Sequence, residues 1–215
     1  MSILKKVSGN EEEKAVGMDF YSAVKGRRSI YALDKNVGVS DERIMEVINH
    51  SVLHTPSAFN SQTGRVVVLF GEGHDKLWNI TMEALRKVVP AANFKDTEDK
   101  INSFKAGYGT VLYFEDQKAV KGLQEQFALY KDNFPVWSNQ GSGMLQNVIW
   151  TALYIEGLGA SLQHYNELIE EEVSKAFNLP KGWKMMAQMP FGNIVQEAGE
   201  KQFAPLEGRV KVIRK

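Results

Sequence analysis

Apolar residues recur at helical spacing in DERIMEVINHSVL, residues 41–53. The stripe consists of Ile44, Val47, Ile48 and Val52. This spacing predicts an amphipathic helix with one face on a hydrophobic core. Ser40 precedes the stretch as a suitable N-cap, and Pro56 follows it where the helix is expected to end.

Two short, continuous apolar runs predict strands that are buried on both faces. They are RVVVLF at residues 65–70 and TVLYF at residues 110–114, and glycine borders both runs. Helical patterns at residues 74–89, 97–106 and 123–134 supply helices that could cover such strands. The chain is therefore expected to be a mixed α and β protein.

The stretch SGMLQNVIWTALYIEGLG, residues 142–159, is apolar in nearly every direction around a helix. Its apolar residues are Met144, Leu145, Val148, Ile149, Trp150, Ala152, Leu153, Tyr154 and Ile155. Because a helix that is apolar all round is buried all round, residues 142–156 are expected either at the centre of the monomer or in a large dimer interface. Gly157 and Gly159 are expected to stop this helix.

Two further strands are predicted in the second half of the chain. One is ASLQHY at residues 160–165, directly after the buried helix. The other is GRVKVI at residues 208–213, where charged and apolar residues alternate. On a strand, Arg209 and Lys211 would share one face with their side chains about 7 Å apart.

Composition limits the class of protein. A chain of 215 residues, 43% of them hydrophobic and 24% charged, predicts a single domain at residues 17–215, preceded by a polar, aperiodic tail at residues 1–16. Because 26 basic residues balance 26 acidic ones, a nucleic-acid partner is not expected. The sequence shows no signal peptide and no apolar run long enough to span a membrane. A cytoplasmic protein is therefore expected.

Familiar catalytic and metal-binding motifs are incomplete. GEGHDK at residues 71–76 lacks the remaining residues of a dinucleotide or phosphate-binding loop, so a tight turn is expected there. HSVLH at residues 50–54 spaces two histidines as in zinc-binding helices, but the chain has no cysteine and no evident third ligand. No metal site is predicted, and no serine lies in a nucleophile elbow. If the protein is an enzyme, a cofactor is expected to carry the difficult step.

Two short stretches could bind an anion or a polar ligand. RRSIY, residues 27–31, places two arginines side by side, which indicates either a solvated helix end or a phosphate clamp. TPSAFNSQTGR, residues 55–65, offers hydroxyls and amides without net charge before the first strong strand. That stretch could be an ordinary polar loop, or it could bind the hydroxyls and the imide edge of a planar cofactor.

The order of these motifs resembles that of the nitroreductase family of flavoproteins. The matching stretches are RRSIY, PSAFNSQ at 56–62, EGLGASLQHYN at 156–166 and the basic stretch near the C-terminus. The resemblance extends over nearly the whole chain, from Met18 to Arg214. KAGYGTVLYFED and GASLQHYN resemble the branch that contains fungal fatty-acid repression proteins and bacterial copper-induced nitroreductases. The resemblance implies an α+β fold with a central, mostly antiparallel sheet flanked by helices. It also implies an intertwined homodimer with FMN sites built from both chains.

The resemblance further implies which residues bind FMN. They are Arg27, Arg28, Ser29, Tyr31, Pro56, Ser57, Asn60, Gln62, Lys105, Gln163, His164, Tyr165, Asn166, Arg209 and Lys211. The arginines, Ser29 and Lys211 would hold the phosphate and the ribityl chain. Pro56, Ser57 and Asn60 would come from the partner subunit, and Gln62 would lie nearer the ring. The backbone N–H of Asn166 would point at flavin N5, and Lys105 would lie near the pyrimidine end of the ring.

The chain departs from the family pattern at two places. Tyr31 stands where the family often has arginine or lysine, and Thr63 and Gly64 replace a common tryptophan or proline. These departures concern the range of substrates and the reduction potential of the flavin. They leave the expected cofactor unchanged.

The implied activity is that of an NAD(P)H oxidoreductase with ping-pong kinetics. NAD(P)H would reduce FMN and leave, and a nitroaromatic, quinone or similar planar acceptor would then take the electrons. Phe127, Tyr130, Phe134 and Trp137 would line the substrate pocket, or would be core residues at helical spacing. Two alternatives stay open: an FMN-binding, redox-responsive regulator of lipid or metal stress with incidental reductase activity, and a flavin-free interaction protein that keeps only the fold.

Overall fold

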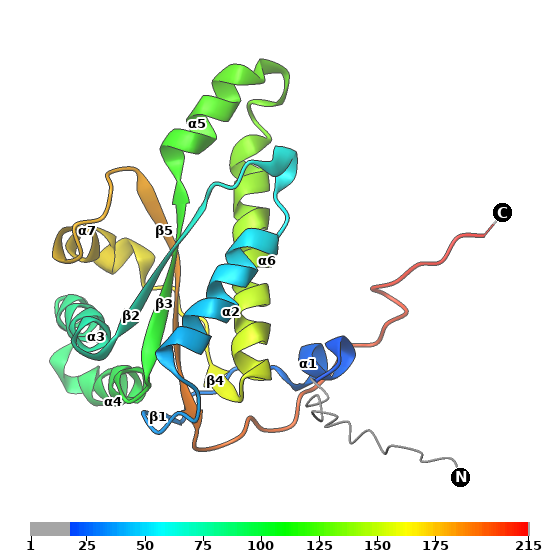
Figure 1. Ribbon diagram of the computed structural model, residues 1–215. Helices are drawn as coiled ribbons and strands as arrows, with labels where there is room; N and C mark the ends of the chain where they lie inside the picture. Colours follow the sequence, from blue (N-terminus) through cyan, green and yellow to red (C-terminus); the bar gives the residue numbers. More distant parts are fainter. Residues whose placement is uncertain (1–17, 215) are drawn as a thin grey trace, which may run out of the picture.

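The computed structural model describes residues 18–214 (Figure 1). Residues 1–17 and 215 lie outside this description, so the predicted tail at residues 1–16 is not tested. The α-helices are α1 (Phe20–Gly26), α2 (Asp41–His54), α3 (Gly71–Arg86), α4 (Phe94–Lys105), α5 (Gln117–Gln126), α6 (Phe134–Ile155) and α7 (Asn166–Ala176). The strands are β1 (Leu33–Asp34), β2 (Gly64–Phe70), β3 (Gly109–Asp116), β4 (Leu158–Ala160) and β5 (Trp183–Ile194), and short 3-10 helices include η1 (Ala58–Asn60) and η3 (Ala128–Tyr130).

One sheet organises the fold. Its strands follow the order β1-β5-β3-β2, β4 also pairs with β5, and each of these pairings is antiparallel. The predicted α+β class with a mostly antiparallel sheet is confirmed. Within residues 18–214 no helix has the length and apolar character needed to cross a bilayer.

Helices cover both faces of the sheet, as Figure 1 shows. On one face, α2 and α6 pack on β3 and β5 through residues that include Ile48, Ile149 and Met189. On the other face, α3, α4 and α7 form a second core with Trp78 and Phe104 at its centre. The layers are therefore helix, sheet and helix, and β3 has seven consecutive buried residues between them.

The structure corrects several predicted strands. The stretch 65–70 forms β2 but is mostly half-buried, because β2 is an edge strand rather than a central one. The stretch 160–165 contributes only the end of β4 and an isolated bridge at Gln163. The stretch 208–213 forms no strand: it is exposed and lies in the C-terminal segment that runs away from the body (Figure 1).

The longest strand, β5, is not predicted from the sequence. Its middle residues are buried on both faces of the sheet, so no polar–apolar alternation marks it. It also contains Pro190 and Gly192, which usually indicate a strand end. Gly192 is required by packing, because a Cβ there would lie 2.5 Å from the carbonyl oxygen of Asp34 on β1.

Helix boundaries differ from the predicted ones. The expected helix at 123–134 is divided between the end of α5, η3 and the start of α6. The glycine turn at residues 71–76 is the first part of α3, which begins at Gly71 with a positive φ of 51°. The apolar helix at 142–156 is the second half of the longer α6.

Helix α6 is apolar on two faces, but only one of them is covered within the chain. Leu145, Ile149 and Leu153 are buried against the sheet and α2. On the outer side, Met144, Val148 and Ile155 are 41%, 37% and 44% exposed. Of the two places expected for this helix, the centre of the monomer therefore accounts for only one face.

A buried polar network ties α3, α4 and β3 together. His74 Nε2 lies 3.1 Å from the carbonyl oxygen of Lys105, and Nδ1 lies 2.8 Å from the hydroxyl of Thr110. Because the carbonyl can only accept, Nε2 carries the proton and Nδ1 accepts from Thr110. Thr110 in turn accepts from the indole N–H of Trp78 at 3.0 Å. Burial lowers the pKa of His74, so the folded protein holds this histidine neutral.

We expect His74 to make the folded state less stable in mild acid. The unfolded chain binds a proton near pH 6.5 and the folded chain does so only at lower pH, so stability is lost as pH falls below about 6.5, by up to about 1.4 kcal/mol per pH unit. Urea unfolding at pH 7.5 and 5.5, at one protein concentration, measures this loss. His74→Gln should show a smaller loss than the unmodified protein. An equal loss in the two proteins would contradict the assignment.

Candidate functional site

The RRSIY stretch lies between the end of α1 and β1, pressed against α6 and β4. Gly26 allows the close approach, since a Cβ there would lie 2.7 Å from the ring of Tyr154 on α6. The Arg27 guanidinium then stacks over the ring of Trp150 at 4.2 Å. The chain continues alongside β4, where the N–H of Ile30 donates to the carbonyl of Ala160 at 2.9 Å.

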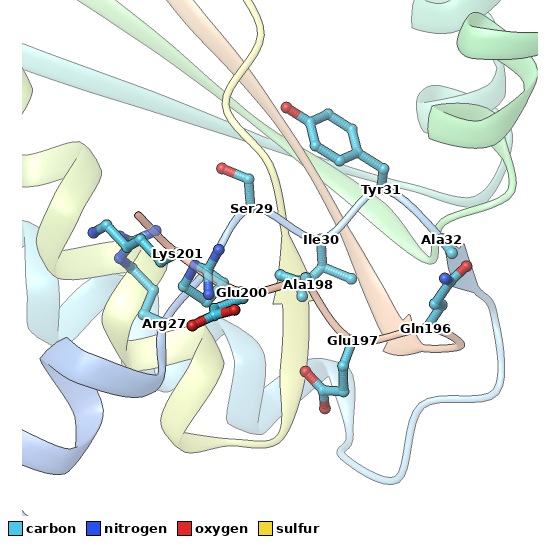
Figure 2. Close-up of a pocket in the computed structure, with 12 residues that line it drawn as sticks. Arg27, Ser29, Ile30, Tyr31, Ala32, Gln196, Glu197, Ala198, Glu200 and Lys201 are labelled. Carbon is cyan, nitrogen blue, oxygen red and sulfur yellow. The ribbon is translucent and has the colours of Figure 1, made fainter. Parts of the chain in front are cut away.

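The two adjacent arginines face a hollow of about 630 Å³. Residues 27–32 form one wall and residues 196–201 form the other, as Figure 2 shows. Within residues 18–214, neither Arg27 nor Arg28 has a carboxylate within 4 Å. Burial, followed by the charge of Arg28, lowers the pKa of Arg27. Glu197 and Glu200 also line the hollow, but neither forms an ion pair with Arg27 or Arg28. The two like charges therefore have no direct carboxylate partner, which suits an anionic ligand.

The stretch from Gln163 to Asn166 lies on the adjoining side of this region. Gln163 pairs with Gln188 of β5 through two backbone hydrogen bonds of 2.7 and 2.9 Å. The side chain of Gln188 also accepts from the N–H of Tyr165 at 2.8 Å and donates to the side chain of Asn166 at 2.7 Å. Helix α7 begins at Asn166 without a side-chain cap, so its first backbone N–H groups are not used by a capping side chain.

Tyrosines connect this stretch with RRSIY. Burial raises the pKa of Tyr165, and the neighbouring Tyr31 raises it further. The Tyr31 ring also lies 6.4 Å from the ring of Phe104, at the end of α4. The next residue, Lys105, donates from Nζ to the side chain of Asn79 on α3 at 2.8 Å. The structure therefore brings residues 27–31, Lys105 and residues 163–166 to one side of the molecule.

The polar loop that contains Pro56, Ser57, Asn60 and Gln62 lies elsewhere. Phe59 of this loop stacks on Trp137 near the start of α6, whereas Arg27 stacks on Trp150 near its end. Thirteen residues of helix separate the two tryptophans, which corresponds to about 20 Å. Figure 1 shows this separation along α6. One chain therefore does not bring the two predicted halves of the site together.

Arg209 and Lys211 are also not brought to the arginines. The predicted strand at 208–213 is wrong, because among residues 18–214 the segment has no neighbouring strand edge to pair with. Both residues are exposed in the segment that leaves the body of the protein (Figure 1). In their place, Lys201 is the basic residue of the C-terminal segment that lines the hollow with Arg27 and Arg28 (Figure 2).

The four predicted pocket residues do gather, but around a residue that sequence reasoning missed. The rings of Phe127, Tyr130, Phe134 and Trp137 all lie within 6 Å of the ring of Phe59, centroid to centroid. The signal in the sequence is that Phe59 is a large apolar residue within an otherwise polar loop.

Glu115 is a second residue that sequence reasoning missed. It lies at the end of β3, and its carboxylate accepts from the hydroxyl of Ser138. Burial raises its pKa. It lines a cavity of about 190 Å³ together with Ser57, Gln62 and Trp137. The sequence could have indicated it as the charged residue that directly follows a continuous apolar run.

The histidines at residues 50 and 54 lie side by side on α2, with ring centroids 4.3 Å apart. In the part of the chain that the structure describes, no group of three or more histidine, aspartate or glutamate side chains is arranged to hold a metal ion.

Comparisons with known proteins agree with this architecture. The sequence model of the nitroreductase family matches residues 24–193. The nitroreductase FRM2 of Saccharomyces cerevisiae is 30% identical over 187 residues, which cover 86% of this chain and 93% of FRM2. The nitroreductase CinD of Lactococcus lactis, solved in complex with chloramphenicol, is 49% identical with a TM-score of 0.85 over 91% of this chain and all of CinD.

CinD has also been solved in complex with 4-nitrophenol. A more distant protein from Exiguobacterium sibiricum, solved in complex with FMN, shares the fold with a TM-score of 0.69 at 17% identity, over 91% of this chain and 98% of that one. These likenesses confirm the family and the fold predicted from the motifs and support the predicted branch. The chain therefore belongs to the nitroreductase family, a family of oxidoreductases.

Proposed function

We propose that the protein is an FMN-dependent NAD(P)H oxidoreductase that reduces nitroaromatics, quinones or similar planar acceptors. The observation that carries the proposal is the pair Arg27 and Arg28, which faces a hollow of about 630 Å³. Among residues 18–214 no carboxylate lies within 4 Å of either guanidinium, although Glu197 and Glu200 line the same hollow. A dianionic phosphate would neutralise both arginines through charge-assisted hydrogen bonds. A bound phosphate would therefore explain why two guanidinium groups lie side by side at a partly buried position.

The other donors around the hollow fit FMN. Ser29 and Tyr31 offer hydroxyls beside the arginines, as the ribityl chain requires (Figure 2). The volume lies within the range of about 300–1,000 Å³ that is usual for cofactor sites. When bound, FMN would supply the hydride chemistry, which the side chains of this site cannot supply themselves.

In this proposal, the side chains and backbone of the protein bind FMN and orient it. Trp150 holds the guanidinium of Arg27 in place by stacking, and Asn79 holds the ammonium group of Lys105. The first N–H groups of α7, beginning at Asn166, present the positive end of the helix dipole. A donor there would favour negative charge on the ring edge that it faces. No side chain is assigned a proton-transfer role.

We also propose that the working site is shared by two chains in a homodimer. Ser57 lies beside Gly141 of α6, whereas Arg27 stacks on Trp150, nine residues or about 14 Å further along the helix. A second copy would therefore supply Ser57, Asn60 and Gln62. The apolar outer face of α6 is exposed within one chain and supports an interface there. The C-terminal segment leaves the body (Figure 1), so Arg209 and Lys211 would reach a phosphate only in another copy.

Planar nitro compounds are the proposed acceptors because CinD, which is 49% identical, binds chloramphenicol and 4-nitrophenol. NAD(P)H as the donor fits the cytoplasmic location expected from the sequence. Donor and acceptor would occupy the same pocket in turn, since one hollow adjoins the arginines in each chain. Ping-pong kinetics would follow from that exclusion.

We expect parallel double-reciprocal lines for NAD(P)H against a nitroaromatic or menadione. Stopped-flow measurement should show loss of flavin absorbance on mixing the FMN-loaded protein with NADH or NADPH, and recovery on mixing with the acceptor. Free FMN at the same concentration is the control. If neither nicotinamide removes the absorbance at a useful rate, a redox-responsive FMN-binding regulator becomes the better reading. A protein that binds no FMN at all would leave only the flavin-free alternative.

A further inference from the structure

Phe59 has a backbone conformation that bulky residues rarely adopt. Its φ and ψ are 58° and 20°, in the left-handed region. Asn60 and Gln62 also have positive φ values of 50° and 47°, so the left-handed conformation occurs three times within four residues. Asparagine tolerates this region, but in phenylalanine the Cβ approaches the following carbonyl oxygen. Such a conformation persists only when surrounding contacts hold it.

The contacts that hold Phe59 are aromatic. Its ring is stacked on Trp137 with an interplanar angle of 21° and a centroid distance of 5.6 Å. Phe127, Tyr130 and Phe134 lie at 5.1, 5.7 and 5.4 Å in tilted or edge-on arrangements. These partners come from the end of α5, from η3 and from the first turns of α6, so the ring is fixed from several elements at once.

Phe59 is nevertheless not an ordinary core residue. Its side chain is 52% exposed, although four aromatic rings surround it. Burial of apolar area is therefore only part of its role. Stacked and edge-on contacts have preferred geometries, so they fix the direction of a ring more strongly than apolar burial alone would.

The conformation of Phe59 determines where the polar groups of the loop point. The turn is closed by the N–H of Asn60, which donates to the carbonyl of Ser57 at 2.9 Å. The N–H of Gln62 donates to the Ser57 hydroxyl oxygen at 3.0 Å. Because that oxygen acts as an acceptor, its hydrogen stays available to a ligand. The loop thus presents the Ser57 hydroxyl beside the amides of Asn60 and Gln62.

We propose that Phe59 is a positioning residue, whose ring is held in the aromatic cluster so that Phe59, Asn60 and Gln62 keep their left-handed conformation and residues 57–62 stay ready to bind a ligand. In this view Phe127, Tyr130, Phe134 and Trp137 serve first to hold the binding loop. The inference rests on the proposed function in one respect, which is that this loop forms half of a flavin site. The holding of the loop itself does not depend on any ligand.

Amide hydrogen exchange of the protein without added FMN tests the holding directly. In Phe59→Gly, the left-handed backbone is allowed but the ring is lost. The amides of Asn60, Ser61 and Gln62 should then exchange at least about tenfold faster than in the unmodified chain. Phe59→Tyr keeps the ring and should restore protection. Leu129→Ala, at an 85% exposed position in η3, is the matched control and should change nothing.

A second variant separates the ring contact from the flexibility of glycine. Trp137→Leu leaves the sequence of residues 57–62 unchanged but removes the ring on which Phe59 stacks. It should also speed the exchange of the amides of Asn60, Ser61 and Gln62. Circular dichroism and thermal unfolding would show that each variant is folded. FMN affinity, from flavin titration, should fall in Phe59→Gly and Trp137→Leu and return in Phe59→Tyr.

The outcomes separate the two ideas. If protection of the three amides is unchanged in both Phe59→Gly and Trp137→Leu, the positioning role is wrong, whatever the flavin titration gives. If protection is lost as expected but the unmodified protein binds no FMN, the loop is held as proposed and the proposed function fails. If protection is lost and FMN affinity does not change, the loop does not serve the flavin site and the positioning role toward it is overturned.

Discussion

Replacing Val148 with glutamate should leave the protein monomeric and unable to retain FMN. Val148 is 37% exposed on the outer face of α6, between Met144 and Ile155, which are also exposed. In a dimer that covers this face, a carboxylate at its centre would be buried without a partner, which is strongly unfavourable. The fold of one chain should survive, because Leu145, Ile149 and Leu153 occupy the opposite face of the helix.

Light scattering after size-exclusion chromatography would give the mass, and flavin titration would give the affinity. The unmodified protein should show twice the chain mass of 24.2 kDa, and Val148→Glu should show that mass once. FMN affinity should fall by about a hundredfold or more, since the Ser57 loop would no longer reach the arginines. Val88→Glu, at a 58% exposed position after α3 on the other side of the sheet, is the control. An unmodified protein that binds FMN as a stable monomer at micromolar concentration would contradict the shared site.

Removing either arginine of RRSIY should weaken FMN binding while leaving the dimer folded. Loss of one charge-assisted contact should cost about 1.5–3 kcal/mol, or roughly ten- to hundredfold in affinity. Arg28→Ala isolates the charge. Arg27→Ala also removes the stacking on Trp150, so Arg27→Lys, which keeps the charge without the planar group, should recover only part of the affinity.

Flavin titration of the apo variants measures these effects. Lys25→Ala, one turn earlier on α1 and exposed, is the matched control and should bind FMN as the unmodified protein does. Arg209→Ala tests the role of the C-terminal segment. It should weaken FMN binding only if the C-terminal segment of one copy reaches the site of another. Unchanged FMN affinity in both Arg27→Ala and Arg28→Ala would contradict the hypothesis that the two arginines bind the phosphate.

Local sequence patterns correctly predicted the elements that depend mainly on residues close together along the chain. The Ser40 cap of α2 is as predicted, since the Ser40 hydroxyl accepts from the N–H of Arg43. Of the predicted stripe, Ile44 and Ile48 are buried, but Val52 is 40% exposed, so the stripe does not reach the core at its last position. The run 110–114 lies within β3 and is buried on both faces. These features depend on residues that are neighbours along the chain, and helical spacing or a continuous apolar run reports them directly.

Other features depend on residues that are distant in sequence. Strand β5 lies between β1 and β3 and carries no alternation, so only its neighbours make it a strand. The run 208–213 alternates as a strand should, but a strand also needs an edge to pair with, and none lies beside it in the part of the chain that the structure describes. The alternation of residues 208–213 therefore has the period of a strand, but the segment does not form one.

The sequence alone determined the family, the mixed α and β class and the antiparallel sheet, and it left two interpretations of the adjacent arginines, a solvated helix end or a phosphate clamp. These conclusions follow from the order of motifs and from local periodicity. Only the tertiary structure decided that Arg27 stacks on Trp150, that Phe59 stacks on Trp137 about 20 Å away along α6, and that Phe59 has a left-handed conformation with four rings around it. The physical reason is that stacking, burial and strain depend on contacts between residues that are distant in sequence. Local sequence patterns contain no information about those contacts.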